Sequence, residues 1–148
     1  MNLFLRVLRL LPPEIAHKIA LDLLSLSFKL GILSFIFRKP NDENCSFAGM
    51  DLSNRLGTAA GLDKNGDYID CLGALGFGFL EVGTVTPMPQ YGNPKPRVFR
   101  NFDENSIINR LGFNNRGVDR LVENLKSRSF DGIVAVSYTH LRAHETSQ

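Results

Sequence analysis

The chain has 148 residues, 43% of them hydrophobic and 22% charged, and its formal net charge is +2. This length allows one ordinary domain with a buried core, and the composition argues against wholesale disorder and against a polytopic membrane protein. A charge this close to balance gives no indication of nucleic-acid binding.

Residues 1–39 are apolar and basic, and they predict two amphipathic helices. Large apolar residues recur at helical spacing up to Leu11, where Pro12-Pro13 ends one helix and starts another at Glu14. These residues also interrupt the apolar run that a cleavable signal peptide needs, so we expect a cytoplasmic protein. The two helices either lie in a membrane interface or form a helical cap on the rest of the domain, and the residues leave both interpretations open.

The second helical pattern resembles a membrane span in length but not in content. It contains the charged residues Asp22 and Lys29, and each charge costs roughly 2.5 to 3.5 kcal/mol near a bilayer centre. Gly31 also breaks its regularity. We therefore predict no transmembrane span.

Residues 39–46, "KPNDENCS", form a polar connector that marks the expected boundary of the N-terminal segment. Beyond it, strand and helix patterns alternate, which is typical of a parallel α/β sheet or barrel. Only three such strands are visible, too few to close a barrel. In chain order the expected elements are a strand that enters a tight turn at 56–61, a helix at 67–75, a strand at 78–85, a helix at 114–128 and a strand at 131–136.

A long connection separates the second of these strands from the last helix. Four prolines between residues 87 and 96 prevent a helix there. The stretch 97–109 predicts a small hairpin that turns at Asp103-Glu104-Asn105. Connections of this length in compact domains are commonly functional.

The stretch "AAGLDKNG" places small residues and a lysine at the end of the first expected strand. Ligands of parallel α/β folds bind beyond the carboxyl ends of the strands. Ala59-Ala60-Gly61 would let a flat ring approach the backbone, and Lys64 could bind an anionic substrate or the edge of a reduced cofactor. Thr84 and Thr86 end the second strand in the same way. An ordinary solvated loop and threonines that only cap a turn are the alternative interpretations.

Asn109, Asn114 and Asn115 surround Gly112 in "NRLGFNN". Carboxamides both donate and accept hydrogen bonds, so they suit a planar ligand with imide or carboxylate groups, although asparagine and glycine are also the commonest turn residues.

No metal site is expected. His140 and His144 lack the spacing and third ligand of a zinc site, and Cys45 and Cys71 are far apart, which favours free thiols in a reducing compartment.

Three motifs together resemble the N-terminal part of class 2, quinone-dependent dihydroorotate dehydrogenases: "AAGLDKNG", "GFLEVGTVTPMPQYGNPKPRVFR" and "INRLGFNNRG". The resemblance covers roughly residues 1–135. "LPPEIAHKIALDLL" is similar to the helical extension of that class. The resemblance implies the N-terminal part of a (β/α)8 TIM barrel, preceded by a small two-helix extension.

The resemblance also implies an activity and its partners. The family oxidises dihydroorotate to orotate in UMP biosynthesis, with FMN as hydride acceptor and a membrane quinone as final oxidant. The helices of residues 1–39 would collect the quinone by peripheral contact with the cytoplasmic face of the inner membrane.

Site residues follow from the same motifs. The residues implied in FMN binding are Ala60, Gly61, Leu62, Asp63, Lys64 and Thr84, and those implied in binding dihydroorotate or orotate are Lys64, Asn109, Arg110, Leu111, Gly112 and Phe113.

The family's serine base and its phosphate-binding loops are expected beyond this chain, so no catalytic residue is assigned and the 148-residue chain is expected to be inactive. Residues 136–146, "VSYTHLRAHET", resemble a translated sequencing adapter. The expected organisation is therefore an amphipathic extension at 1–39, the first βα units of an FMN-binding barrel at 40–135 and a non-native tail at 136–148. The alternative functions are another FMN-dependent barrel oxidoreductase and a membrane-surface interaction module formed by residues 1–39.

Overall fold

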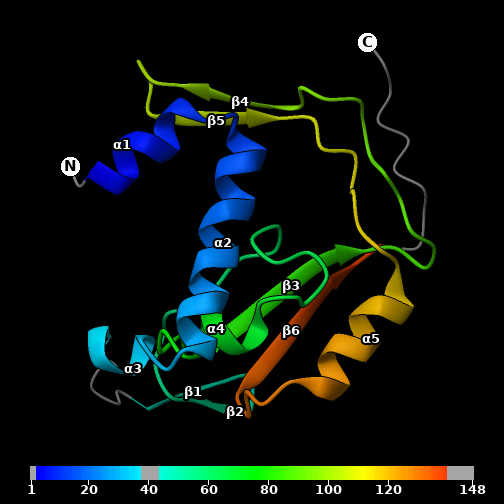
Figure 1. The fold of residues 1–148 in the computed structure, drawn as a ribbon. Helices are drawn as coiled ribbons and strands as arrows, with labels where there is room; N and C mark the ends of the chain where they lie inside the picture. Colours follow the sequence, from blue (N-terminus) through cyan, green and yellow to red (C-terminus); the bar gives the residue numbers. More distant parts are fainter. Residues whose placement is uncertain (1–2, 38–43, 140–148) are drawn as a thin grey trace.

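The computed structural model describes residues 3–37 and 44–139 and shows a mixed α/β architecture (Figure 1). Most of the predicted connector at 39–46 lies outside the described residues, as do His140 and His144. Two strands run side by side at the centre, helices cover one side of them, and a separate hairpin lies at the far end of the longest helix.

The N-terminal region consists of three helices that change direction at proline and glycine. They are α1 (Leu3–Leu10), α2 (Pro13–Lys29) and α3 (Leu33–Ile36). Pro13 occupies the first position of α2, where a missing N–H group costs nothing. Gly31 has a φ of +72°, which ends the helical run before α3. Within the described residues, no helix is both long enough and apolar enough to cross a bilayer.

A short hairpin, not expected from the sequence, follows the N-terminal helices. It pairs β1 (Cys45–Phe47) with β2 (Met50–Leu52) in antiparallel register. Ala48 and Gly49 form its turn with φ angles of +50° and +78°. Two residues with positive φ are typical of the tight turns of hairpins, but an alanine in the first position hides the usual Asn-Gly signal.

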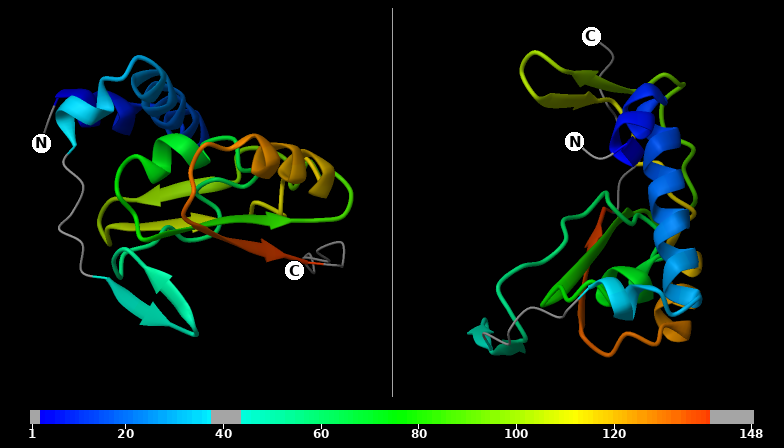
Figure 2. Two further views of the ribbon diagram at one scale, coloured as in Figure 1. Left: turned by 90° about the horizontal axis from the view of Figure 1, so that it is seen from below. Right: turned by 60° about the vertical axis from the view of Figure 1, so that its left-hand side comes forward.

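The central pair consists of β3 (Phe79–Val85) and β6 (Ile133–Tyr138), which run parallel with Leu80 opposite Val134. The helices α4 (Ile69–Gly73) and α5 (Val118–Ser127) lie on one side of this pair, as the left view of Figure 2 shows. These elements confirm the predicted alternation of strands and helices. β6 extends through Tyr138, and the origin of the segment after Ala135 stays a prediction.

The strand predicted at 56–61 is reduced to a single parallel bridge between Gly57 and Phe79. The pairing does not continue beyond Gly57, because the hydroxyl of Thr58 accepts a hydrogen bond from the N–H of Glu81 at 2.9 Å. A side chain therefore occupies a position that a backbone carbonyl would take in a continuous ladder.

The core lies between β3 and the helices. Leu80 and Val82 alternate along β3 and are each 1% exposed. Burial of one such side chain is worth about 1.5–3 kcal/mol. The buried cluster also contains Leu21, Leu33, Ile69, Cys71, Leu72, Val85 and Leu121. Because Leu21 and Leu33 belong to this cluster, α2 and α3 pack on the same core as the βα units.

The predicted hairpin is confirmed as β4 (Val98–Asn101) paired with β5 (Ser106–Asn109). It lies beside the first turns of α2 and against α1 (Figure 1). Arg100 joins the hairpin to α1 by donating hydrogen bonds to the carbonyls of Leu8, Arg9 and Leu11 at 3.4, 3.0 and 2.8 Å. These carbonyls belong to the last turn of α1 and to the residue that follows it, so the arginine caps this helix.

Candidate functional site

A cleft of about 990 Å³ opens between α2, the turn that follows Ala60, the loop that follows β3, and the β4–β5 hairpin. Such a volume is typical of small-molecule and cofactor sites. The predicted site residues Gly61, Leu62, Asp63, Lys64, Asn109 and Leu111 all line it. The cleft therefore brings together the predicted cofactor turn and part of the predicted substrate segment.

The turn that carries Lys64 is held directly on β3. The N–H of Gly61 donates to the carbonyl of Gly83 at 2.8 Å, and the N–H of Gly83 donates to the carbonyl of Asp63 at 3.1 Å. Gly61 has a φ of +100°, and a Cβ atom added there would meet nothing within 4 Å. Open space thus lies directly beside a bare backbone, which fits a flat ligand.

Asp63 supports the turn from inside. The residue is 2% exposed, and its carboxylate accepts hydrogen bonds from the N–H groups of Asp67 and Tyr68 at 3.0 and 2.8 Å. Burial raises the pKa of Asp63, although these backbone hydrogen bonds act in the opposite direction. The carboxylate therefore closes the turn before α4, and its predicted contact with the cofactor stays a prediction.

Lys64 points across the cleft to the segment that precedes α5. Its ammonium group donates to the side-chain oxygen of Asn114 at 2.9 Å. Burial lowers the pKa of Lys64, and the nearby charge of Arg97 lowers it further. A half-buried ammonium group whose hydrogen-bond partner is a neutral amide can accept an anionic ligand with little rearrangement.

The predicted substrate residues divide into two groups. Asn109 and Leu111 line the cleft. Arg110 instead donates to the carbonyl of Pro96 at 3.2 Å, and its guanidinium lies 5.8 Å from the ring centre of Phe99. Gly112 and Phe113 form the turn with φ angles of +70° and +48°.

Thr84 is part of β3, and its side chain reaches toward β6. Its hydroxyl is 2.9 Å from the hydroxyl of Ser137 on β6. The predicted role of Thr84 at the cofactor stays a prediction.

Thr86 and Asn115 form a buried polar pair, and Asn115 also lines the cleft. The amide of Asn115 donates to the Thr86 hydroxyl at 2.8 Å and to the carbonyl of Phe113 at 2.7 Å, and its oxygen accepts from the N–H of Gly117 at 2.8 Å. This pair fixes the loop after β3 to the start of α5. These bonds support the structural interpretation of Thr86, whereas Asn115 combines a structural contact with a place in the wall of the cleft.

The helix α2 contributes residues that sequence reasoning did not assign to the site. Glu14, His17 and Lys18 line the cleft from one side of α2. Burial lowers the pKa of His17 below its ordinary value of 6.5, and the charge of Lys64 lowers it further. The signal available in the sequence was the polar side of the amphipathic pattern in "PEIAHKIA", which does not show by itself what it faces.

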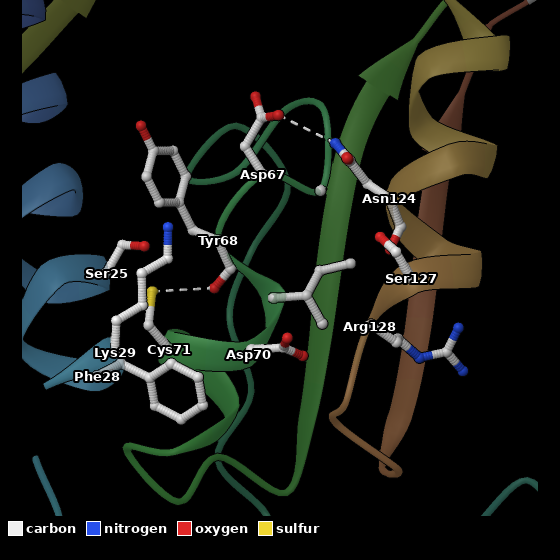
Figure 3. A pocket seen from close by; sticks show the side chains of 12 residues that line it. Ser25, Phe28, Lys29, Asp67, Tyr68, Asp70, Cys71, Asn124, Ser127 and Arg128 are labelled. Atoms are coloured by element: carbon white, nitrogen blue, oxygen red, sulfur yellow. Dashed lines mark hydrogen bonds between the residues drawn. The ribbon is translucent and has the colours of Figure 1, made fainter. Parts of the chain in front are cut away.

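A second cavity, of about 150 Å³, lies between α2, α4 and α5 (Figure 3). The thiol of Cys71 faces it and donates to the carbonyl of Tyr68 at 3.2 Å. Burial raises the pKa of Cys71 to about 11, so this free cysteine stays protonated and unreactive near neutral pH. The larger cleft, which contains Lys64, is therefore the better candidate for the functional site.

Comparison with known proteins identifies the family. The dihydroorotate dehydrogenase family profile matches residues 44–139. The chain belongs to the dihydroorotate dehydrogenase family. A dihydroorotate dehydrogenase (quinone) from Marinobacter nauticus is 52% identical over 127 residues, and one from Buchnera aphidicola subsp. Schizaphis graminum is 53% identical over 133 residues.

The chain spans less than two fifths of these relatives. The two matches cover 86% and 89% of this chain but 37% and 39% of the relatives. A solved structure of dihydroorotate dehydrogenase from Eimeria tenella in complex with ferulenol shares 32% identity and a TM-score of 0.67, and the match covers 86% of this chain and 36% of that one. The fold described above thus matches about a third of a longer family member.

Proposed function

We propose that the protein to which this segment corresponds is a quinone-dependent dihydroorotate dehydrogenase that oxidises dihydroorotate to orotate in UMP biosynthesis. The observation that carries the proposal is the half-buried ammonium group of Lys64, held over an open cleft by Asn114. It stands at the end of the βα units in a chain that is 52% identical to a dihydroorotate dehydrogenase (quinone).

FMN is the cofactor that we propose for this cleft, and when bound it would accept a hydride from the substrate. The open space beside Gly61 fits the flat ring of a flavin. Ala60, Leu62 and Asp63 would form the wall beside the ring, with Lys64 at its edge. Thr84 would contribute from the end of β3.

Dihydroorotate and orotate are carboxylates, and the cleft presents the ammonium group of Lys64 to an anion. Lys64 would hold the substrate through its ammonium group, and the exposed amide of Asn109 would donate to or accept from the pyrimidine ring. Leu111, which belongs to the same segment, also lines the cleft. Arg110, Gly112 and Phe113 would shape it without direct access to the cleft, which refines the site set expected from the motifs.

The quinone would approach along the N-terminal helices. Leu10 is 87% exposed and Phe35 is 91% exposed, so α1 and α3 present large apolar side chains to their surroundings. Such side chains beside basic residues favour peripheral contact with a membrane, here the cytoplasmic face of the inner membrane. α2 then forms the wall between this surface and the cleft.

We infer that residues 40–135 correspond to the first units of a (β/α)8 barrel and that the 148-residue chain alone has no turnover. The parallel β3–β6 pair, with α4 and α5 on one side, supports the barrel. The serine base and the phosphate-binding loops of the family would be supplied by sequence beyond these units.

The test uses a full-length hybrid protein, in which residues 1–135 of this chain precede the unmatched C-terminal part of the Marinobacter nauticus relative. Dihydroorotate oxidation is measured with quinone, fumarate or NAD as oxidant. The proposal expects turnover with quinone and FMN bound. Turnover only with fumarate or NAD would favour another FMN-dependent barrel oxidoreductase. Vesicle binding by residues 1–39 alone, with no flavin bound by the hybrid, would favour the membrane-surface module.

A further inference from the structure

Arg97 is a buried arginine, 6% exposed, whose nitrogens reach two different walls of the cleft. Nε and Nη2 donate to one oxygen of Glu14 on α2 at 3.1 and 2.9 Å. Nη1 donates to the carbonyls of Tyr91 and Asn93 at 2.7 and 3.0 Å, with a longer bond of 3.5 Å to the carbonyl of Leu111. One planar group therefore joins α2, the loop after β3 and the predicted substrate segment.

The loop is shaped around this guanidinium. Gly92 has a φ of +73°, and a Cβ atom there would lie 2.8 Å from Nη1 of Arg97 and 2.2 Å from the carbonyl oxygen of Leu111. The N–H of Asn93 donates to that same carbonyl at 3.1 Å. A side chain at position 92 would therefore displace either the arginine or the substrate segment.

On the α2 side, Glu14 lies in the first turn of the helix, ahead of the core residue Leu21. Burial alone would raise the pKa of Glu14, but the hydrogen bond and charge of Arg97 outweigh it and the pKa lies below its ordinary value of 4.5. The ion pair therefore stays charged near neutral pH. His17 follows one turn later and faces the cleft, so the position of Glu14 also sets the position of His17.

We propose that Arg97 is a positioning residue that couples the quinone-side helix α2 to the substrate-side segment 109–113, which keeps the two walls of the cleft in one geometry. The identities of the two ligands, quinone and dihydroorotate, rest on the function proposed above. The coupling between α2 and residues 109–113 concerns only this chain. Arginine suits the task because its fork of donors satisfies a carboxylate and several carbonyls at once. A lysine has one nitrogen and cannot serve both walls.

The experiment compares three variants in the hybrid protein. Glu14→Gln weakens only the hydrogen bonds between Arg97 and α2. Arg97→Lys keeps the positive charge but has a single donor nitrogen, so it weakens the hydrogen bonds to α2 and those to the loop and segment on the other wall. Arg128→Gln is the matched control, because Arg128 also donates to backbone carbonyls, those of Leu125 and Phe130, but at the C-terminal end of α5 and outside the residues that line the cleft.

Two readouts distinguish coupling from general stability. The first is hydrogen–deuterium exchange of peptides from the first turns of α2, from 109–113 and from β3, which requires neither turnover nor flavin. The second is the KM for quinone and for dihydroorotate. Glu14→Gln should accelerate exchange in α2 and raise the quinone KM about tenfold, the effect of one charge-assisted hydrogen bond, with the dihydroorotate KM within about twofold.

Arg97→Lys should accelerate exchange in both walls and raise both KM values, whereas Arg128→Gln should change neither. Equal acceleration in β3 and in both walls would overturn the proposal in favour of a purely structural role, and so would an unchanged α2 in Glu14→Gln. If Arg97→Lys does not fold, Glu14→Gln alone decides. Coupled exchange in a hybrid without dihydroorotate oxidation would support the positioning role and reject the proposed function.

Discussion

Asp63 and Lys64 are neighbours in the chain, but the first side chain stabilises a turn and the second faces the cleft. Asp63 is buried and accepts two backbone hydrogen bonds, while Lys64 reaches Asn114 across the cleft. The carboxylate closes a turn that would otherwise leave two N–H groups without acceptors, and the closed turn aims the ammonium group. A buried structural carboxylate thus stands next to the lysine that we propose as a ligand-binding residue.

Replacement of Lys64 tests the ligand role. Lys64→Ala removes the ammonium group without disturbing the hydrogen bonds of Asp63, so orotate binding by the hybrid should weaken at least about tenfold. Isothermal titration of orotate measures the effect, and Lys126→Ala, at an exposed position on α5, is the control. Equal affinity of the Lys64 and Lys126 variants would exclude Lys64 from the substrate site.

Replacement of Asp63 tests the structural role. Asp63→Asn places an amide donor against one of the two N–H groups, so the free energy of unfolding should fall by about 1–3 kcal/mol. Urea denaturation of the hybrid provides the measurement, with the exposed Asp131→Asn as control. An unchanged midpoint would mean that the turn does not depend on this carboxylate.

His17 predicts a pH dependence of stability. Its folded pKa lies below 6.5, so the unfolded chain binds more protons between these two values and the free energy of unfolding rises as the pH increases through that window. His17→Gln should flatten this part of the profile. Denaturation of the hybrid at a series of pH values between 5 and 7 gives the slope, and identical slopes for the two proteins would contradict the prediction.

At the scale of elements, β3 holds the site together because three parts of the chain contact it. The turn after Ala60 bonds to Gly83, Thr84 meets Ser137 on β6, and Thr86 is joined to Asn115 ahead of α5. Residues at the end of a parallel strand can bond to neighbouring strands and to the following loops at once, which explains why the cleft forms at this end.

A matched pair of glycine substitutions tests this arrangement. Gly83 has a φ of +110°, and an added Cβ atom would lie 2.3 Å from the carbonyl oxygen of Ser137. Gly83→Ala should therefore cost roughly 3 kcal/mol or more of unfolding free energy. Gly31 also has a positive φ, +72°, but an added Cβ atom there would meet nothing within 4 Å. Gly31→Ala should therefore cost only about 1 kcal/mol of unfolding free energy. Urea denaturation of the two hybrids compares them, and equal costs would refute the predicted clash.

At the scale of the whole molecule, the N-terminal helices are both a surface and part of the core. Leu21 and Leu33 are buried with the βα units, whereas Leu10 on α1 is exposed. α1 contacts the β4–β5 hairpin through Arg100, away from the central strands. Removal of all the helices would thus expose the core, while removal of α1 would leave it covered.

Deletion of residues 1–11 from the hybrid should consequently impair quinone reduction more than flavin reduction. The reductive half-reaction with dihydroorotate would take place at the turn that carries Lys64, whereas α1 contacts the β4–β5 hairpin through Arg100. The rate of that half-reaction should therefore stay within about twofold, whereas the KM for quinone should rise about tenfold. Stopped-flow reduction of the flavin and steady-state quinone kinetics give the two values. Equal losses in both reactions would show that α1 supports the whole protein instead of the path of the quinone.

The sequence alone determined the elements whose signal is local. Proline placed the boundary between α1 and α2, alternation of apolar residues placed β3 and β6, and the turn residues placed the β4–β5 hairpin, because backbone preferences and burial periodicity depend on near neighbours. The motif around Lys64 also identified the cleft, since the ends of successive parallel strands must meet.

Only the tertiary structure decided which residues from different elements contact one another. It joined Arg97 to Glu14 across 83 positions of the chain, brought His17 to the cleft, and reduced the strand expected at 56–61 to one bridge. The physical reason is the same in each case. A side chain's hydrogen-bond partner is chosen by burial and distance in the folded molecule, and residues far apart in the chain carry no local pattern that reveals this choice.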